Sequence, residues 1–152
     1  MYEFISHSEE DTISFANEFA SKLNSNSIIV LSGDLGSGKT TFVKGIAKAL
    51  NINEVVTSPT FTLLKTYSSE KFTLVHVDAY RLDGSSFEEL YDYLNNDNVI
   101  FIEWSSCLAN TDFLQEYLSI SITYKSKNQR EFDINAKGKR YLSFLKEFDH
   151  NV

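Results

Sequence analysis

The chain has 152 residues, 42% of them apolar and 14% aromatic, which is typical of one folded domain spanning residues 1–152. Its formal net charge of −7, from 21 acidic and 14 basic residues, argues against unaided binding to nucleic acid, which needs clustered Lys and Arg. The single cysteine excludes an internal disulfide, no secretory signal is evident, and aliphatic runs of about five residues are too short to cross a bilayer, so we expect a cytoplasmic protein without membrane contact.

The first 50 residues predict a strand, a helix, a second strand and a second helix. Tyr2–Ile5 forms the first strand, and Ser8 is a typical helix N-cap ahead of apolar residues that recur at helical spacing as far as Leu23. Four β-favouring aliphatic residues, Ile28–Leu31, predict a buried strand. The second helix is expected over Lys39–Leu50.

Between the second strand and the second helix lies Gly33-x-x-x-x-Gly38-Lys39-Thr40, which matches the P-loop pattern. Such a loop wraps so that successive N–H groups and the helix N-terminus face a phosphate chain. We expect Lys39 to place its ammonium between the outer phosphates and the Thr40 hydroxyl to bind Mg²⁺. A chance glycine-rich turn is the alternative, but the strand, the helix and a second hydroxyl at Thr41 are the context that phosphate binding requires. The predicted ligand is Mg-nucleotide.

The rest of the chain predicts mostly strands. After a short extended segment at Val55–Val56, which leads toward Pro59, the expected elements are a strand pair over Thr62–Tyr67 and Phe72–Val77, a short amphipathic helix within Gly84–Leu94, a buried strand at Val99–Ile102, a hairpin of Tyr117–Tyr124 and Arg130–Ala136, and a helix over Tyr141–Phe148. The expected fold is α/β, a P-loop NTPase-like three-layer sandwich whose mixed sheet is extended by C-terminal antiparallel strands.

Two acidic residues directly follow apolar strands: Asp78 after Leu74–Val77, and Glu103 after Val99–Ile102. In open α/β sheets, ligands lie at the carboxyl ends of the strands, so both carboxylates are placed to reach a metal. Each has the strand-then-acid form of a Walker B element. One is expected to touch Mg²⁺, directly or through water, and the other to orient the attacking water or to relay the switch state. The residues alone leave both assignments open.

Two neighbours of these acids have competing interpretations. His76 lies two residues before Asp78 and shares its strand face, but a lone strand histidine is more often structural than catalytic. Trp104, the only tryptophan, either packs on the nucleotide base or on a partner, or belongs to the core.

With these residues in place, the chain resembles the TsaE family, also known as YjeE, small bacterial ATPases needed for threonylcarbamoylation of the tRNA adenosine beside the anticodon. The segments that carry the resemblance, in the family's order, are Gly33–Thr41, Thr57–Phe61, His76–Leu82 and Ile102–Trp104. With the helix that begins at Glu9, the likeness spans most of residues 1–140. Ser105–Cys107 departs from the family's usual proline-and-acid continuation, which leaves the role of that loop open.

The resemblance implies an ATPase that is weak alone and acts on an assembly of TsaD, the transferase, with TsaB, so that tRNA is reached only indirectly. It implies that Thr40 and Glu103 bind Mg²⁺, that Asp78 is the catalytic acid, and that Ser58–Phe61 form a nucleotide-sensing switch. The absence of a guanine-reading Asn-Lys-x-Asp motif favours ATP. The residues expected on the nucleotide are Gly36, Ser37, Gly38, Lys39, Thr40, Thr41, Trp104 and Arg130, the last with a surface ion pair as the alternative.

Two other functions share the P-loop. A small-molecule or nucleoside kinase needs cations over the transferred phosphoryl group, often from an arginine-bearing lid, and the chain has only Arg81, Arg130 and Arg140. A non-catalytic nucleotide-sensing module would bind ATP without a functional Asp78. Phosphate release from ATP and water, with no acceptor present, separates the ATPase from the kinase.

Overall fold

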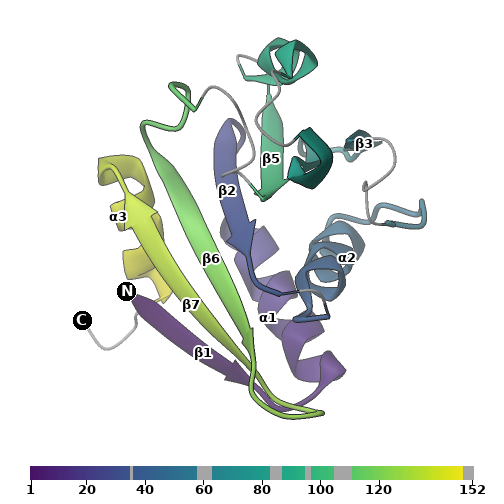
Figure 1. Cartoon of the computed structure of the whole chain (residues 1–152), viewed down its shortest axis with the longest axis vertical. Helices are drawn as coiled ribbons and strands as arrows, with labels where there is room; N and C mark the ends of the chain where they lie inside the picture. The colour runs from purple at the N-terminus through teal and green to yellow at the C-terminus, as the bar shows by residue number, and fades with distance from the viewer. Residues whose placement is uncertain (35, 58–62, 83–86, 95–96, 105–110, 149–152) are drawn as a thin grey trace.

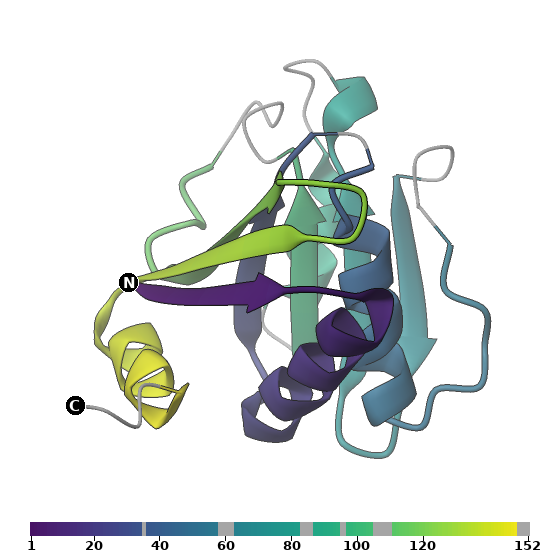
Figure 2. The same cartoon turned by 90° about the horizontal axis from the view of Figure 1, so that it is seen from below.

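The computed structural model describes residues 1–34, 36–57, 63–82, 87–94, 97–104 and 111–148, and Figures 1 and 2 show it in two views. One seven-stranded mixed sheet runs in the order β1-β7-β6-β2-β5-β4-β3. Its strands are β1 (Tyr2–Ser6), β2 (Ser27–Ser32), β3 (Leu64–Ser68), β4 (Thr73–Asp78), β5 (Asn98–Glu103), β6 (Tyr117–Tyr124) and β7 (Arg130–Lys137). The helices are α1 (Glu9–Lys22), α2 (Lys39–Ala49) and α3 (Lys139–Phe148), with 3₁₀ turns at η1 (Tyr80–Leu82) and η2 (Glu88–Tyr93).

The directions of the strands place most of their carboxyl ends at one edge of the sheet. β2 pairs in parallel with both β5 and β6, and β4 pairs in parallel with β5. β1 and β6 are both antiparallel to β7, so these two strands also run the same way. The carboxyl ends of β1, β2, β4, β5 and β6 therefore meet at one edge, while β3 and β7 run in the opposite direction.

The two faces of the sheet are covered differently. In Figure 2 the three α-helices lie on one side of the sheet, where buried phenylalanines such as Phe19, Phe42 and Phe132 pack between helices and strands. The 3₁₀ turns cover the other face over β4 and β5, where Val75 and Ile100 are buried. Alternate strand residues point to opposite faces, so one strand such as β4 supplies both cores. The sheet is thus the middle layer, as the sequence predicts.

The helix pair that supports the site is held by two local features. The Ser8 hydroxyl accepts a hydrogen bond from the Asp11 N–H at 3.0 Å, so Ser8 caps α1 as predicted. Gly45 of α2 faces Ala16 of α1 so closely that a Cβ on Gly45 would lie 2.6 Å from the Ala16 Cβ. α2, which begins at the P-loop, is therefore packed directly against α1.

One sequence prediction is corrected. The segment expected as an amphipathic helix within Gly84–Leu94 is a 3₁₀ helix over Glu88–Tyr93, in the part that is described, because it is short and its N-terminus has no side-chain cap. The predicted extended segment at Val55–Val56 pairs with no strand among the described residues. Val55 is exposed, while Val56 packs into the helix-side core. No described helix combines the length and the hydropathy needed to cross a bilayer.

Candidate nucleotide-binding site

A pocket of about 460 Å³ lies at the edge where the parallel strands end. The P-loop and the start of α2 form its floor, and the ends of β4 and β5 supply acidic side chains. Its remaining wall comes from the start of α1 and the β6–β7 turn. The lining residues are Ser8, Glu9, Thr12, Gly36, Gly38, Lys39, Thr40, Thr41, Asp78, Glu103, Trp104, Lys127, Asn128 and Arg130.

The P-loop keeps its shape through backbone conformations that favour glycine. Gly33 has φ +147°, and a Cβ there would lie 2.5 Å from the Ile122 carbonyl oxygen. Gly38, with φ +114°, is the N-cap of α2, and no side chain caps this helix. The first N–H groups of α2 have no intrahelical partner and accumulate partial positive charge. This is the arrangement that binds anions.

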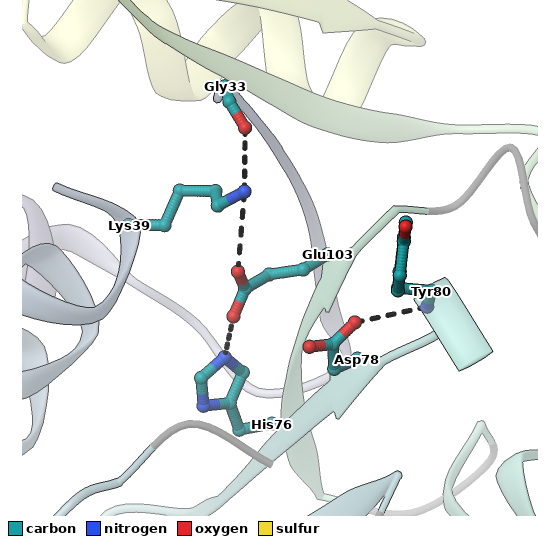
Figure 3. A network of polar contacts seen from close by, with 6 residues as sticks. All are labelled: Gly33, Lys39, His76, Asp78, Tyr80 and Glu103. Atoms are coloured by element: carbon teal, nitrogen blue, oxygen red, sulfur yellow. Dashed lines mark hydrogen bonds and ion pairs between the residues drawn. The ribbon is translucent and has the colours of Figure 1, made fainter. Parts of the chain in front are cut away.

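Lys39 lines the pocket and is buried, at 7% exposure, and Figure 3 shows its polar contacts. Its Nζ donates a hydrogen bond to the Gly33 carbonyl oxygen at 2.6 Å and lies 3.7 Å from Glu103 Oε1. The same ammonium is 4.6 Å from the centre of the Trp104 ring. The P-loop lysine therefore rests against its own loop, an acid and an aromatic face, all within the pocket.

The two predicted acids are brought together by strand register. Asp78 and Glu103 end adjacent parallel strands and are paired partners, so their side chains emerge on the same face. Both are buried, at 5% and 4% exposure. Asp78 Oδ1 accepts a hydrogen bond from the Tyr80 N–H at 3.0 Å, which ties it to the η1 turn. Glu103 is held by Lys39 and by His76.

His76 makes a contact that sequence reasoning did not identify. Its Nε2 lies 2.6 Å from Glu103 Oε2, and both side chains are buried. The contact joins residues on neighbouring strands that are 27 positions apart in the chain. A strand histidine gave no signal of it, because the pairing of β4 with β5 cannot be read from either strand alone.

Trp104 and Arg130 both line the pocket and make different contacts. Trp104 has φ +59°, an unusual value for a bulky residue, and this turns the chain away at the end of β5. Its ring lies 5.1 Å from that of Tyr80, at the Lys39 end of the pocket rather than in the core. Arg130 stacks on Tyr124, with Cζ 4.4 Å from the ring centre, and donates to the Ser126 carbonyl at 2.8 Å.

The wall formed by α1 and the β6–β7 turn was also missed. Ser8, Glu9 and Thr12 line the pocket from the start of α1, opposite Lys127 and Asn128 of the turn. The cap residue was the available signal, but it predicts only where the helix begins. Strand order, which places β1 two strands from β6, decides that this helix start borders the P-loop.

An ion pair supports the β6–β7 turn. Lys125 Nζ lies 2.9 Å from Glu131 Oε2, and the hydrogen bond and charge of Glu131 raise the pKa of Lys125 above its ordinary value. Lys125 also closes the turn through its N–H, which donates to the Gln129 carbonyl at 3.0 Å. These contacts hold the segment that carries the turn's pocket residues.

The donor set of the pocket fits magnesium. Thr40 supplies a hydroxyl, and Asp78 and Glu103 supply carboxylates. Mg²⁺ prefers such oxygen ligands and is usually bound by one or two carboxylates together with waters and substrate phosphates. The predicted switch at Ser58–Phe61 and the loop at Ser105–Cys107 lie outside the described residues.

Comparisons with known proteins agree with these motifs. The family model described as "Threonylcarbamoyl adenosine biosynthesis protein TsaE" matches residues 6–132. The tRNA threonylcarbamoyladenosine biosynthesis protein TsaE of Bacillus subtilis is 36% identical over 143 residues, covering 93% of this chain and 90% of that protein. Its counterpart in Aquifex aeolicus is 37% identical over 137 residues, covering 89% and 96%. The crystal structure of Bacillus subtilis YdiB matches with a TM-score of 0.84 and 32% identity, covering 97% and 93%.

Proposed function

Because the chain belongs to the TsaE family of tRNA threonylcarbamoyladenosine biosynthesis proteins, we propose that it is a Mg²⁺-dependent ATPase that acts with TsaD and TsaB homologues. The observation that carries the proposal is the convergence of Lys39, Asp78 and Glu103 on one pocket at the head of α2. A phosphate-binding loop, a cation and two carboxylates are the parts that phosphoryl transfer from a nucleotide requires. We place the reaction in the cytoplasm, with tRNA reached only through the partner proteins.

The phosphates of ATP bind to the loop and the start of α2. The N–H groups of Gly36 and of Gly38 to Thr41 donate to phosphate oxygens, whereas the Ser37 N–H donates to the Asp34 carbonyl at 3.0 Å. The helix dipole favours the negative charge of the phosphates. Lys39 leaves the Gly33 carbonyl and turns its ammonium to the outer phosphates, which are stronger acceptors because they are charged. Binding thus exchanges an internal hydrogen bond for a charge-assisted one.

Thr40 and Glu103 would hold the magnesium ion, which would supply positive charge against the charge that develops on the phosphates. Asp78 lies beside Glu103 and is proposed to accept a hydrogen bond from the attacking water, so that a lone pair of the water faces the γ-phosphate. The Tyr80 N–H holds one Asp78 oxygen, which fixes the orientation of the carboxylate. Lys39 stabilises the charge on the transferred group.

We assign the base and ribose to the part of the pocket that the P-loop does not form. Ser8 and Thr12 of α1 and Asn128 of the β6–β7 turn line the pocket there. Hydroxyl and amide groups there offer hydrogen bonds to the edge of adenine. The cavity volume lies in the range that is typical of small-ligand sites.

The contacts of Arg130 and Arg140 argue against a kinase. Arg140 donates to the carbonyl of Asn26 at 3.0 Å, at the start of β2 and so at the opposite edge of the sheet from the pocket. Arg130 lines the pocket, but among the described contacts it is held by carbonyls of its own turn. Arg140 is therefore remote from the pocket and Arg130 is engaged by its own turn, while the side chain of Arg81 lies outside the described part of the structure.

The proposal is tested by reconstitution. Purified TsaD and TsaB are incubated with tRNA and the threonylcarbamoyl donor, with and without this chain and ATP, and modified adenosine is measured. We expect modification over repeated turnovers only when chain and ATP are both present, together with phosphate release that needs no acceptor other than water. Equal modification without the chain, or ATP consumption only when a small-molecule acceptor is added, would contradict the proposal.

A further inference from the structure

We propose that His76 is a positioning residue that fixes the Glu103 carboxylate for the magnesium ion of the bound nucleotide, an inference that rests on the function proposed above. Figure 3 shows His76 directed at Glu103 from the neighbouring strand, on the side away from Lys39. The Nε2–Oε2 distance is 2.6 Å, and His76 is fully buried. The contact is therefore shielded from water, which strengthens a hydrogen bond to a charged acceptor.

The chemistry of the pair assigns the hydrogen. An ionised carboxylate offers only acceptors, so His76 Nε2 carries the hydrogen and donates it to Glu103. The other ring nitrogen, Nδ1, is buried and has no hydrogen-bond partner among the described residues. A buried polar atom without a partner is unfavourable, and an aliphatic side chain at this strand position would avoid it. The useful property of histidine here is thus its Nε2–H group.

This hydrogen bond gives the two Glu103 oxygens different partners. Oε2 is engaged by His76, and Oε1 is directed to the Lys39 side at 3.7 Å from Nζ, a distance longer than a hydrogen bond. Oε1 is the oxygen left to the magnesium ion. Without His76, the carboxylate is free to rotate and close on the Lys39 ammonium, which would remove a metal ligand. Partners that orient a metal ligand commonly change metal affinity about 10- to 100-fold when they are lost.

Three variants test the inference, of which two should show a selective defect and the third should not. His76→Met removes the donor and keeps a side chain of similar length, and His76→Leu does the same with a different shape. His76→Gln keeps an N–H donor at about the reach of Nε2, and it also removes the ring and Nδ1. A residue that only fills the core would tolerate Met at least as well as Gln, whereas a positioning residue is rescued by Gln alone.

The measurement is calorimetric binding of a non-hydrolysable ATP analogue to the full chain, in EDTA and over a series of Mg²⁺ concentrations. We expect His76→Met and His76→Leu to raise the half-saturating Mg²⁺ concentration by about tenfold or more. Affinity in EDTA should stay within about threefold of wild type, since the backbone grip on phosphate is intact. His76→Gln should restore the Mg²⁺ dependence to within about threefold.

Tyr67→Phe is the matched control. The Tyr67 hydroxyl of β3 is likewise buried without a described partner, and it lies outside the pocket lining. Its removal should leave the Mg²⁺ dependence unchanged. Unaltered Mg²⁺ dependence in His76→Met, or equal impairment in His76→Gln, overturns the inference alone. Wild-type protein that binds the analogue with no Mg²⁺ dependence overturns the proposed function as well.

A second measurement uses the wild-type protein, so it tests the inference even if a His76 variant does not fold. ¹⁵N spectra of histidine-labelled wild-type protein report which ring nitrogen of His76 carries hydrogen, and the signal is assigned among the three histidines by its absence in His76→Gln or by sequential connectivity. We expect hydrogen on Nε2, and its signal should shift in Glu103→Gln. Hydrogen on Nδ1 with a bare Nε2 would overturn the inference.

Discussion

The two buried carboxylates at the ends of β4 and β5 lie side by side, but they have different hydrogen-bond and charge partners. Glu103 faces the Lys39 ammonium and accepts a hydrogen bond from His76, whereas Asp78 accepts one from the Tyr80 backbone. Neighbouring carboxylates with different partners are suited to different roles. This difference supports Glu103 as the metal ligand and Asp78 as the group that orients water.

Asp78→Ala should abolish ATP hydrolysis while leaving Mg-ATP affinity within about tenfold, because most of the grip on phosphate comes from backbone groups. Phosphate release and calorimetric titration measure the two effects separately. Asp78→Asn is the control for packing, since its side-chain oxygen still accepts the Tyr80 N–H. Turnover that is unchanged in Asp78→Ala would remove Asp78 from the mechanism.

At the level of residues, the sequence predicted those site residues that belong to a local motif. Lys39 and Thr40 follow from the P-loop spacing, and Asp78 and Glu103 from their positions after apolar strands. The His76–Glu103 contact was not predictable, because it depends on the register between two strands. For Trp104 the sequence did not decide between packing on the nucleotide base, on a partner or in the core. Its position beside Lys39 depends on a left-handed backbone conformation, which a single tryptophan in the sequence does not predict.

At the level of elements, the P-loop depends on the space around Gly33. A Cβ there would meet both the Ile122 carbonyl and the Ser37 hydroxyl, at 2.5 and 2.6 Å, and the carbonyl belongs to a central strand that cannot retreat. Gly36 also has a positive φ, of +77°, but nothing lies within 4 Å of its Cβ position. A comparison of substitutions at the two glycines therefore separates the effect of backbone strain from that of steric overlap.

Gly33→Ala should lower the free energy of unfolding by about 1–3 kcal/mol more than Gly36→Ala, since only Gly33 adds overpacking to the strain of a positive φ. Chemical denaturation of both variants gives the difference. We expect Gly33→Ala to lose nucleotide binding as well, because the loop must shift. Equal stability of the two variants would mean that the loop adapts without strain.

The start of α1 both caps the helix and borders the pocket. Ser8→Ala removes the acceptor for the Asp11 N–H and should lower the free energy of unfolding by about 1 kcal/mol. Ser21→Ala, in the last turn of the same helix, removes only an exposed hydrogen bond to the Glu18 carbonyl and should be nearly neutral. Urea denaturation compares the two. A Ser21→Ala effect as large as that of Ser8→Ala would argue against the cap.

On the scale of the whole molecule, the site exists because five strands share one direction. The hairpin of β6 and β7 and the pair of β3 and β4 were predictable, since a short polar turn separates each pair. The insertion of β2 between β5 and β6, and the pairing of β1 with β7, were not, because nothing in a strand's own residues selects a distant partner. The α1 wall of the pocket was missed for the same reason.

The central claim is that this pocket binds the phosphates of a magnesium nucleotide. The most direct test is calorimetric titration of the protein with a non-hydrolysable ATP analogue in the presence of Mg²⁺. Lys39→Ala is compared with wild type and with Lys44→Ala, which removes an exposed lysine from the same helix. We predict one-site binding in wild type and in Lys44→Ala, and affinity lower by about a hundredfold or more in Lys39→Ala, whose folding is checked by thermal unfolding. Wild-type affinity in folded Lys39→Ala would contradict the account.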